Sequence, residues 1–133
     1  NYHVAVRHRN HLGVMTAGSQ ALSASPLVID LRNAATPTFG SEARKPVNGA
    51  MVLWAGNVMP NGQLSYTNTD NDRDPILTAI GGVVPTAVLS GYRNEDVNMD
   101  GIVMYTGGNN DRDIILVNIG GTTPTGTRPQ QLP

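Results

Sequence analysis

Three oxygen-bearing residues and a glycine carry the spacing of a calcium-binding loop. Asp96, Asn98 and Asp100 stand at alternate positions, and Gly101 follows directly. In an EF-hand-type loop, side-chain oxygens bind from positions 1, 3 and 5, a glycine at position 6 permits a sharp turn, and the backbone carbonyl of position 7 completes this part of the shell. We therefore expect Asp96, Asn98, Asp100 and the Ile102 carbonyl to be calcium ligands.

The loop does not close where an EF-hand loop closes. The residue at the twelfth position is Gly107, which has no side-chain oxygen. The next acids along the chain are Asp111 and Asp113. We expect Asp111 to be the closing ligand, with Asp113 next to it as a further ligand. The alternative is an Asn- and Asp-rich turn whose aspartates cap a helix.

The calcium-loop segment occurs twice in the chain. Residues 56–86 align without a gap with residues 95–125, at an offset of 39 residues. The Asp-Arg-Asp triplet at 72–74 matches the one at 111–113. Seven of the eight aspartates lie in the two copies, and clustered carboxylates suit calcium better than zinc.

The first copy has fewer charged ligands. Two asparagines replace the aspartates of positions 1 and 5, and Met59 at position 3 offers no oxygen. The candidate ligands of this weaker site are Asn57, Asn61, Gln63, Asp72 and Asp74. Loss of charge weakens calcium binding, and extracellular modules of this kind bind at about 10⁻⁴–10⁻³ M.

Each copy is expected to position its ligands with a short strand and a helix. The strands are predicted at 63–65 and 102–104. The helices begin near the Asp-Arg-Asp triplets, where Asp72 or Asp74 can cap the first one, and paired glycines end both. A helix of roughly eight residues is not stable alone, so we expect the two helices to pack together as a pseudo-twofold pair.

The N-terminal part of the chain has the pattern of strands. We predict a half-buried strand at 2–8, clear strands at 27–31 and 50–56, a weak pairing segment at 14–16, and a long polar loop at 36–49. These strands are too few to close a sandwich of their own. The expected fold is therefore α+β and mainly β: a partial antiparallel sheet or sandwich, followed by a duplicated loop–helix pair.

The predicted organisation follows from these patterns. Residues 1–55 form the partial β-sandwich region, and residues 56–133 form the tandem repeats, divided into 56–94 and 95–133. The tail at 122–133 is either a loose end or an arm that docks elsewhere. We interpret the chain, which begins at Asn1, as a piece of a longer precursor.

Composition excludes several classes of partner. The net charge is −1, so no basic field indicates nucleic acid, and no apolar run reaches membrane-spanning length. The chain has no cysteine, and calcium is the obvious replacement for disulfides in a small secreted domain. We expect a secreted, extracellular or cell-surface protein.

Other chemistry has weaker support. His3, His8 and His11 are close in sequence, but strand and turn geometry scatters such side chains, which disfavours zinc. Trp54 and the repeat tyrosines could stack on sugars, although Trp54 is better explained as a core residue and the tyrosines as loop anchors. No nucleophile elbow, phosphate loop or Ser/His/Asp set is present, so we expect no enzyme.

The second loop and the duplication resemble type I dockerin modules, which also repeat a DxNxDG loop followed by a helix. The resemblance implies dockerin-like calcium pairing and does not imply cohesin binding. The whole chain looks similar to the C-terminal region of secreted surface proteins of Bacteroidota-type bacteria, through YHVAVRHRNHLGVMTA, LWAGN, YTGGNNDRDIILVNIGG and QQLP. This second resemblance implies an extracellular β-protein and no reaction.

Together these patterns favour a non-enzymatic, calcium-stabilised structural module, a subunit of an extracellular filament or surface layer. An open sheet edge would let it self-associate by strand addition. The alternative function is an adhesin or a dockerin-like anchor that binds a protein or glycan partner.

Overall fold

The computed structural model describes all residues from 1 to 133. It contains two helices and four separate sheets, each made of two antiparallel strands. The strands and helices are β1 (Ala5–His8), β2 (His11–Met15), β3 (Lys45–Val47), β4 (Ala50–Val52), β5 (Gln63–Ser65), α1 (Arg73–Ala79), β6 (Val88–Ser90), β7 (Ile102–Met104), α2 (Asp111–Asn118) and β8 (Thr127–Pro129). The mainly-β α+β prediction agrees with this content, but no sandwich forms.

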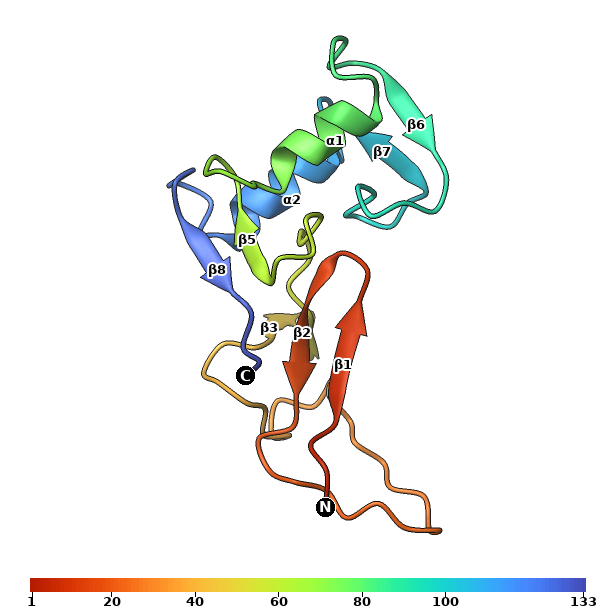
Figure 1. Ribbon diagram of the computed structural model, residues 1–133, viewed down its shortest axis with the longest axis vertical. Helices are drawn as coiled ribbons and strands as arrows, with labels where there is room; N and C mark the ends of the chain where they lie inside the picture. Colours follow the sequence, from red (N-terminus) through yellow and green to blue (C-terminus); the bar gives the residue numbers. More distant parts are fainter.

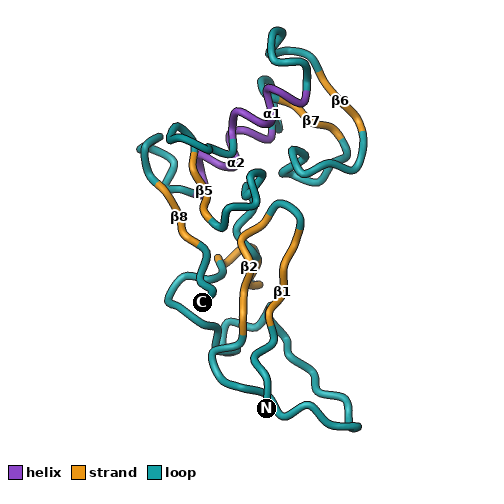
Figure 2. Tube along the Cα trace, in the orientation of Figure 1, coloured by secondary structure: helices purple, strands orange, loops and turns teal.

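The molecule is elongated, with the repeats at one end (Figure 1). The helices α1 and α2 lie side by side there, the β1–β2 hairpin occupies the middle, and the segment that follows β2 reaches the far end. Loops make up most of the trace between these short elements (Figure 2). No helix has the length and apolar character needed to cross a membrane.

The two repeats exchange strands. Strand β5 of the first repeat pairs with β8, and β7 of the second repeat pairs with β6. The segments that form β6 and β8 are 39 residues apart, so they are equivalent parts of the two repeats. Each repeat therefore supplies the last strand of its partner's sheet, and the C-terminal tail docks instead of hanging free.

The helix starts agree with the prediction, but the caps differ. Asp72 occupies the N-cap position of α1 and makes no side-chain cap hydrogen bond. Instead, Asn71 accepts a hydrogen bond from the Asp74 amide, and Asn110 accepts one from the Asp113 amide, both at 2.9 Å. The asparagine before each Asp-Arg-Asp triplet is thus the side chain that caps the helix.

The main core lies between the two repeats. Ile76 of α1 and Ile115 of α2 have no exposed surface, and they pack with Val58, Val97 and Val103 from the loops and strands. Val58 and Ile76 thus match Val97 and Ile115 in this core, whereas Leu64, the equivalent of Val103, packs in a second cluster with Leu12 and Ile119. Short helices that could not persist alone are stabilised by burying this shared face.

The N-terminal strand predictions needed correction. Strand β1 is shorter than predicted and exposed on both faces, with Val6 41% exposed. The buried strand is β2 (His11–Met15), because Leu12 and Val14 pack inward, whereas only a weak pairing segment at 14–16 was predicted here. The prediction of a strand at 27–31 was wrong: this stretch has no strand partner, and Val28 is 87% exposed.

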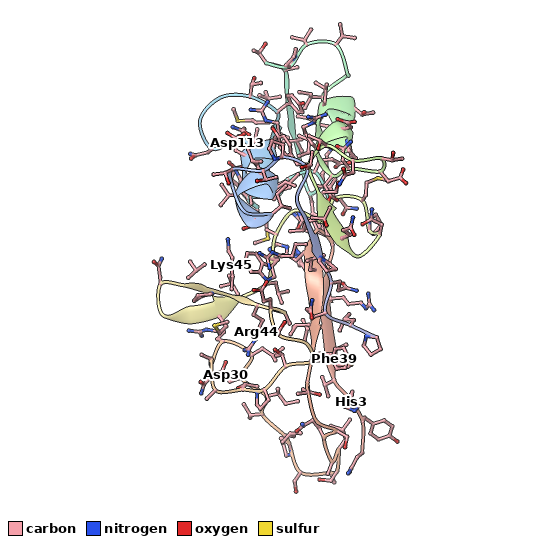
Figure 3. All side chains as sticks on the ribbon, turned by 90° about the vertical axis from the view of Figure 1, so that its left-hand side faces the viewer. His3, Asp30, Phe39, Arg44, Lys45 and Asp113 are labelled. Atoms are coloured by element: carbon pink, nitrogen blue, oxygen red, sulfur yellow. The ribbon has the colours of Figure 1, made fainter.

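The predicted strand at 50–56 is also shorter. Only Ala50–Val52 forms a strand, and its partner β3 lies in the stretch that was predicted to be a polar loop. Trp54 follows, partly buried against Leu12 and Leu64 as a core residue should be. The loop between β2 and β3 is held by the Arg44 side chain, which donates hydrogen bonds to the carbonyl groups of Leu31, Asn33 and Thr36 (Figure 3).

Candidate functional site: the two Asp-rich loops

Two carboxylates hold the loops against the helices. Asp72 and Asp111 are equivalent residues of the two repeats, and neither has exposed surface. Asp111 Oδ1 accepts hydrogen bonds from the amides of Val97 and Asn98 at 2.6 and 3.2 Å, and its Oδ2 accepts one from Met104 at 2.7 Å. Both oxygens of this carboxylate therefore bind backbone of its own loop.

Asp72 repeats the arrangement in the first loop. Its oxygens accept hydrogen bonds from the Met59 amide at 2.9 Å and the Ser65 amide at 2.8 Å. These two donors lie 39 residues before the Asn98 and Met104 donors. Each buried carboxylate, Asp72 or Asp111, thus forms a clamp on its loop, and the two clamps use the same loop positions. A buried carboxylate with several backbone donors fixes a loop more firmly than a turn alone.

Burial works against ionisation of both carboxyl groups. It raises the pKa of Asp72 to about 7, although the backbone hydrogen bonds from the loop pull in the other direction. Burial also raises the pKa of Asp111, and the negative charge of Asp96 adds to this effect. The charged form of Asp111 is therefore disfavoured mainly by burial, against which the three backbone hydrogen bonds of its loop act.

The three loop positions of the second repeat lie together. Asp96 Oδ1 and Asn98 Oδ1 both accept the Asp100 amide hydrogen, at 3.1 and 2.8 Å. Asp100 Oδ1 accepts from the Ile102 amide, and the sharp turn is completed by Gly101 at φ 88°. The predicted ligands at positions 1, 3 and 5 are thus gathered within one turn of chain.

The predicted ligand Asp113 lies on α2 and belongs mainly to its helix. It pairs with the neighbouring Arg112 at 3.1 Å and accepts a hydrogen bond from the Asn110 side chain at 2.8 Å. Its carboxylate nevertheless lines the same cavity of about 600 Å³ as Asn98 and Asp100. Asp113 therefore lies at the rim of the loop, at the repeat end of the molecule (Figure 3).

The second loop suits calcium in the types of its donors. Three carboxylates, one amide oxygen and one carbonyl group come from residues Asp96, Asp100, Asp111, Asn98 and Ile102. One guanidinium, that of Arg9, lies near them, 3.5 Å from Asp96 Oδ2. The acidic side chains do not converge on one point, because Asp111 is directed to the loop amides. Calcium binding with Asp111 as the closing ligand would require some of these hydrogen bonds to be exchanged.

The first loop suits a cation poorly. Asn57 is buried, and its Oδ1 has no hydrogen-bond partner. Asn61 accepts from the Gln63 amide, and Asp74 is paired with Arg73 on the helix. Asn57 and Asn61 line a cavity whose charged residues are arginines, so the predicted ligands of this loop are not surrounded by negative charge.

Sequence reasoning missed two residues that hold the second loop from outside. The Asn10 side chain donates to the carbonyl groups of Asn94 and Asp96 at 3.0 and 2.6 Å, and Arg9 donates to the Arg93 carbonyl at 2.8 Å. Both lie on the β1–β2 turn, more than 80 residues away in sequence. No local spacing signals a contact of this kind.

No protein-family model, curated protein or solved structure matches the chain.

Proposed function

We propose that the chain is a non-enzymatic, secreted structural module that is stiffened by calcium and assembles with further copies of itself by strand addition. The supporting observation is that the chain has an open strand edge and, elsewhere, a segment of strand-like sequence that pairs with no strand. Strand β1 pairs only with β2, so its other edge is open. Residues 21–29 belong to no strand, bend at residues 24 and 25, and make no backbone–backbone hydrogen bond.

The unpaired segment has the side chains of a strand. Leu22, Leu27 and Val28 are 55%, 47% and 87% exposed. An apolar segment whose backbone groups have no strand partner can add to an open sheet edge, and here only the Ser25 amide and carbonyl are engaged, by the Ser23 hydroxyl. Pairing of this segment with β1 of another copy would satisfy its backbone groups and cover its apolar side chains.

Calcium would supply stiffness that the small core does not. Only 24 of the 133 residues are buried, and two of the most buried groups are the clamp carboxylates Asp72 and Asp111. Small domains without disulfides commonly depend on metal or oligomerisation for stability. A cation in the second loop would balance the charges of Asp96, Asp100 and Asp111.

The test is association of the full chain in solution, with calcium and with a chelator. Sedimentation velocity and electron microscopy should show concentration-dependent association or filaments with calcium, and loss of these with the chelator. A Val28→Lys variant should stay monomeric. Val83→Lys is the matched control, because Val83 is 84% exposed but lies outside the unpaired segment.

A discrete monomer at all concentrations in both conditions would refute self-assembly. The dockerin-like anchor or adhesin would then be the better function, since such a module stays monomeric until its partner is present. If Val28→Lys and Val83→Lys reduce association equally, then general surface charge controls the assembly. Strand addition through residues 21–29 would then be refuted.

A further inference from the structure

A polar cavity lies between the β1–β2 turn and the first loop. Its volume is about 400 Å³, and Pro60 is the only apolar residue in its lining. The lining residues are Arg7, His8, Arg9, His11, Asn57, Pro60, Asn61, Gly62 and Gln130. The set contains two arginines and no acid, so the cavity carries positive charge.

We propose that this cavity binds the carboxylate and hydroxyl groups of a uronic acid residue of an acidic polysaccharide. The inference does not depend on calcium binding or on self-assembly. It begins from Asn57, which is only 6% exposed and whose Oδ1 has no hydrogen-bond partner in the chain. A buried acceptor without a donor indicates a missing partner.

The equivalent residue of the second repeat shows what Asn57 lacks. Asp96 accepts hydrogen bonds from the amides of Asp100 and Gly101 and receives Arg9 as an ion-pair partner. Asn57 makes none of these contacts, although it occupies the same position in the repeat. The first loop thus lacks the charge of Asp96 and the hydrogen bonds that Asp96 accepts, although Asn61 and Asp72 still bond within it.

The other lining groups provide donors for an anion. Arg7 takes part in none of the four ion pairs of the chain, whereas Arg9 is engaged by Asp96. Gln130 Oε1 accepts the Gly13 amide at 2.7 Å, which leaves its Nε2 to donate elsewhere. This Nε2 lies over Gly62, where the absent side chain keeps the space open.

These groups select the ligand class. A carboxylate matches the free guanidinium of Arg7, and a hydroxyl can accept from Gln130 Nε2. Asn57 Oδ1 is closed to solvent in the unbound chain, so the Asn57 side chain must turn toward the cavity to accept a ligand hydroxyl. An inorganic sulfate offers no donor for Asn57, and an apolar ligand finds only Pro60 among the apolar residues of the lining. A sugar acid carries the carboxylate and the hydroxyls on one small ring.

The test is titration of the full chain with glucuronate and with oligogalacturonate in the presence of a chelator, followed by NMR shifts or calorimetry. Glucose and sulfate are the matched ligands that lack the carboxylate and the hydroxyls. We expect millimolar binding of the acidic sugars, with glucose and sulfate at least about tenfold weaker. Tighter binding of the oligomer than of glucuronate would identify a polysaccharide as the source of the ligand.

Two variants locate the site. Asn57→Asp places a like charge in the cavity and should weaken acidic sugar binding at least about tenfold. Arg7→Gln should do the same, and Arg7 is exposed, so folding should not change. The control is Arg32→Gln, which lies outside the cavity. No binding of either acidic sugar, or binding that neither Asn57→Asp nor Arg7→Gln weakens, would overturn the proposal.

Discussion

Asp72 and Asp111 lie 39 residues apart and hold the two loops by the same backbone positions. Asp72 accepts from the amides of Met59 and Ser65, and Asp111 accepts from the equivalent amides of Asn98 and Met104. Both repeats therefore carry a buried carboxylate clamp, although only the second has the acidic residues Asp96 and Asp100 in its loop. Because the same hydrogen bonds form in both loops, we expect the clamp to stabilise the fold independently of metal.

Replacement of a clamp carboxylate should therefore destabilise the chain. Asp111→Asn should lower the free energy of unfolding by about 1–3 kcal/mol, since an amide presents one donor to a cluster of backbone donors. Asp72→Asn should cost less at pH 7, because burial raises the Asp72 pKa to about 7 and its carboxyl group is already partly protonated there. Urea unfolding of both variants in chelator measures the difference. Equal unfolding free energies for wild type and Asp111→Asn would contradict a clamp.

Calcium is expected to bind once per chain, in the second loop. A ligand at ten times its dissociation constant stabilises the folded state by about 1.4 kcal/mol, which raises the melting temperature measurably. Asp100→Asn should abolish this shift, because it removes one of the loop charges. Asp70→Asn, which changes an exposed first-loop aspartate, serves as the control. Two bound calcium ions per chain by calorimetry would show that the first loop binds as well.

The local parts of the fold could be predicted from the sequence. The sequence predicted these elements from its glycines, its apolar spacing and its acidic triplets. They are the helices at 73–79 and 111–118 and the strands at 63–65 and 102–104. These signals are local, because a cap, a turn or a helix face depends on residues a few positions apart. The gathering of Asp96, Asn98 and Asp100 in one turn follows from the same kind of signal.

The pairing of strands could not be predicted in this way. Strands β6 and β8 have unrelated sequences, Val-Leu-Ser and Thr-Arg-Pro, although they are equivalent in the two repeats. Their partners are chosen by backbone hydrogen bonds, which leave no side-chain signature. The same reason explains the error at residues 27–31: their composition is that of a strand, but they pair with no strand of the chain.

The docking of the tail provides a further prediction. The Arg128 guanidinium lies 3.7 Å from the centre of the Trp54 ring, donates to the Asn118 carbonyl and pairs with Glu42. Arg128→Ala should destabilise the fold by about 2 kcal/mol through loss of the stacking and of the hydrogen bond.

Trp54 is the only tryptophan, so its fluorescence reports directly on the loss of this contact. The emission spectrum of the folded Arg128→Ala variant should change. Arg93→Ala removes an exposed arginine whose side chain has no such contact and should leave both the spectrum and the stability unchanged. An unchanged spectrum in Arg128→Ala would show that the tail is not held on Trp54 in solution.

Acid should weaken the chain through His11. Burial, followed by the positive charges of His8, Arg9 and Lys45, lowers the His11 pKa from 6.5 to about 4. His11 Nδ1 also lies 2.9 Å from His8 Nδ1, so protonation of both rings would set two cations in contact. The unfolded chain therefore binds more protons than the folded chain between these two pKa values, and stability falls as the pH drops from about 6.5 towards 4.

This acid sensitivity can be assigned to one residue. The melting temperature of the wild type should decline across that pH range, and His11→Gln should show a smaller decline while retaining a hydrogen-bonding side chain. His3→Gln is the control, because His3 bonds only the Thr16 carbonyl and lies away from the His8–His11 pair. If His11→Gln and His3→Gln both follow the wild-type profile, then carboxylates that lose their charge, rather than a buried neutral imidazole, control acid unfolding.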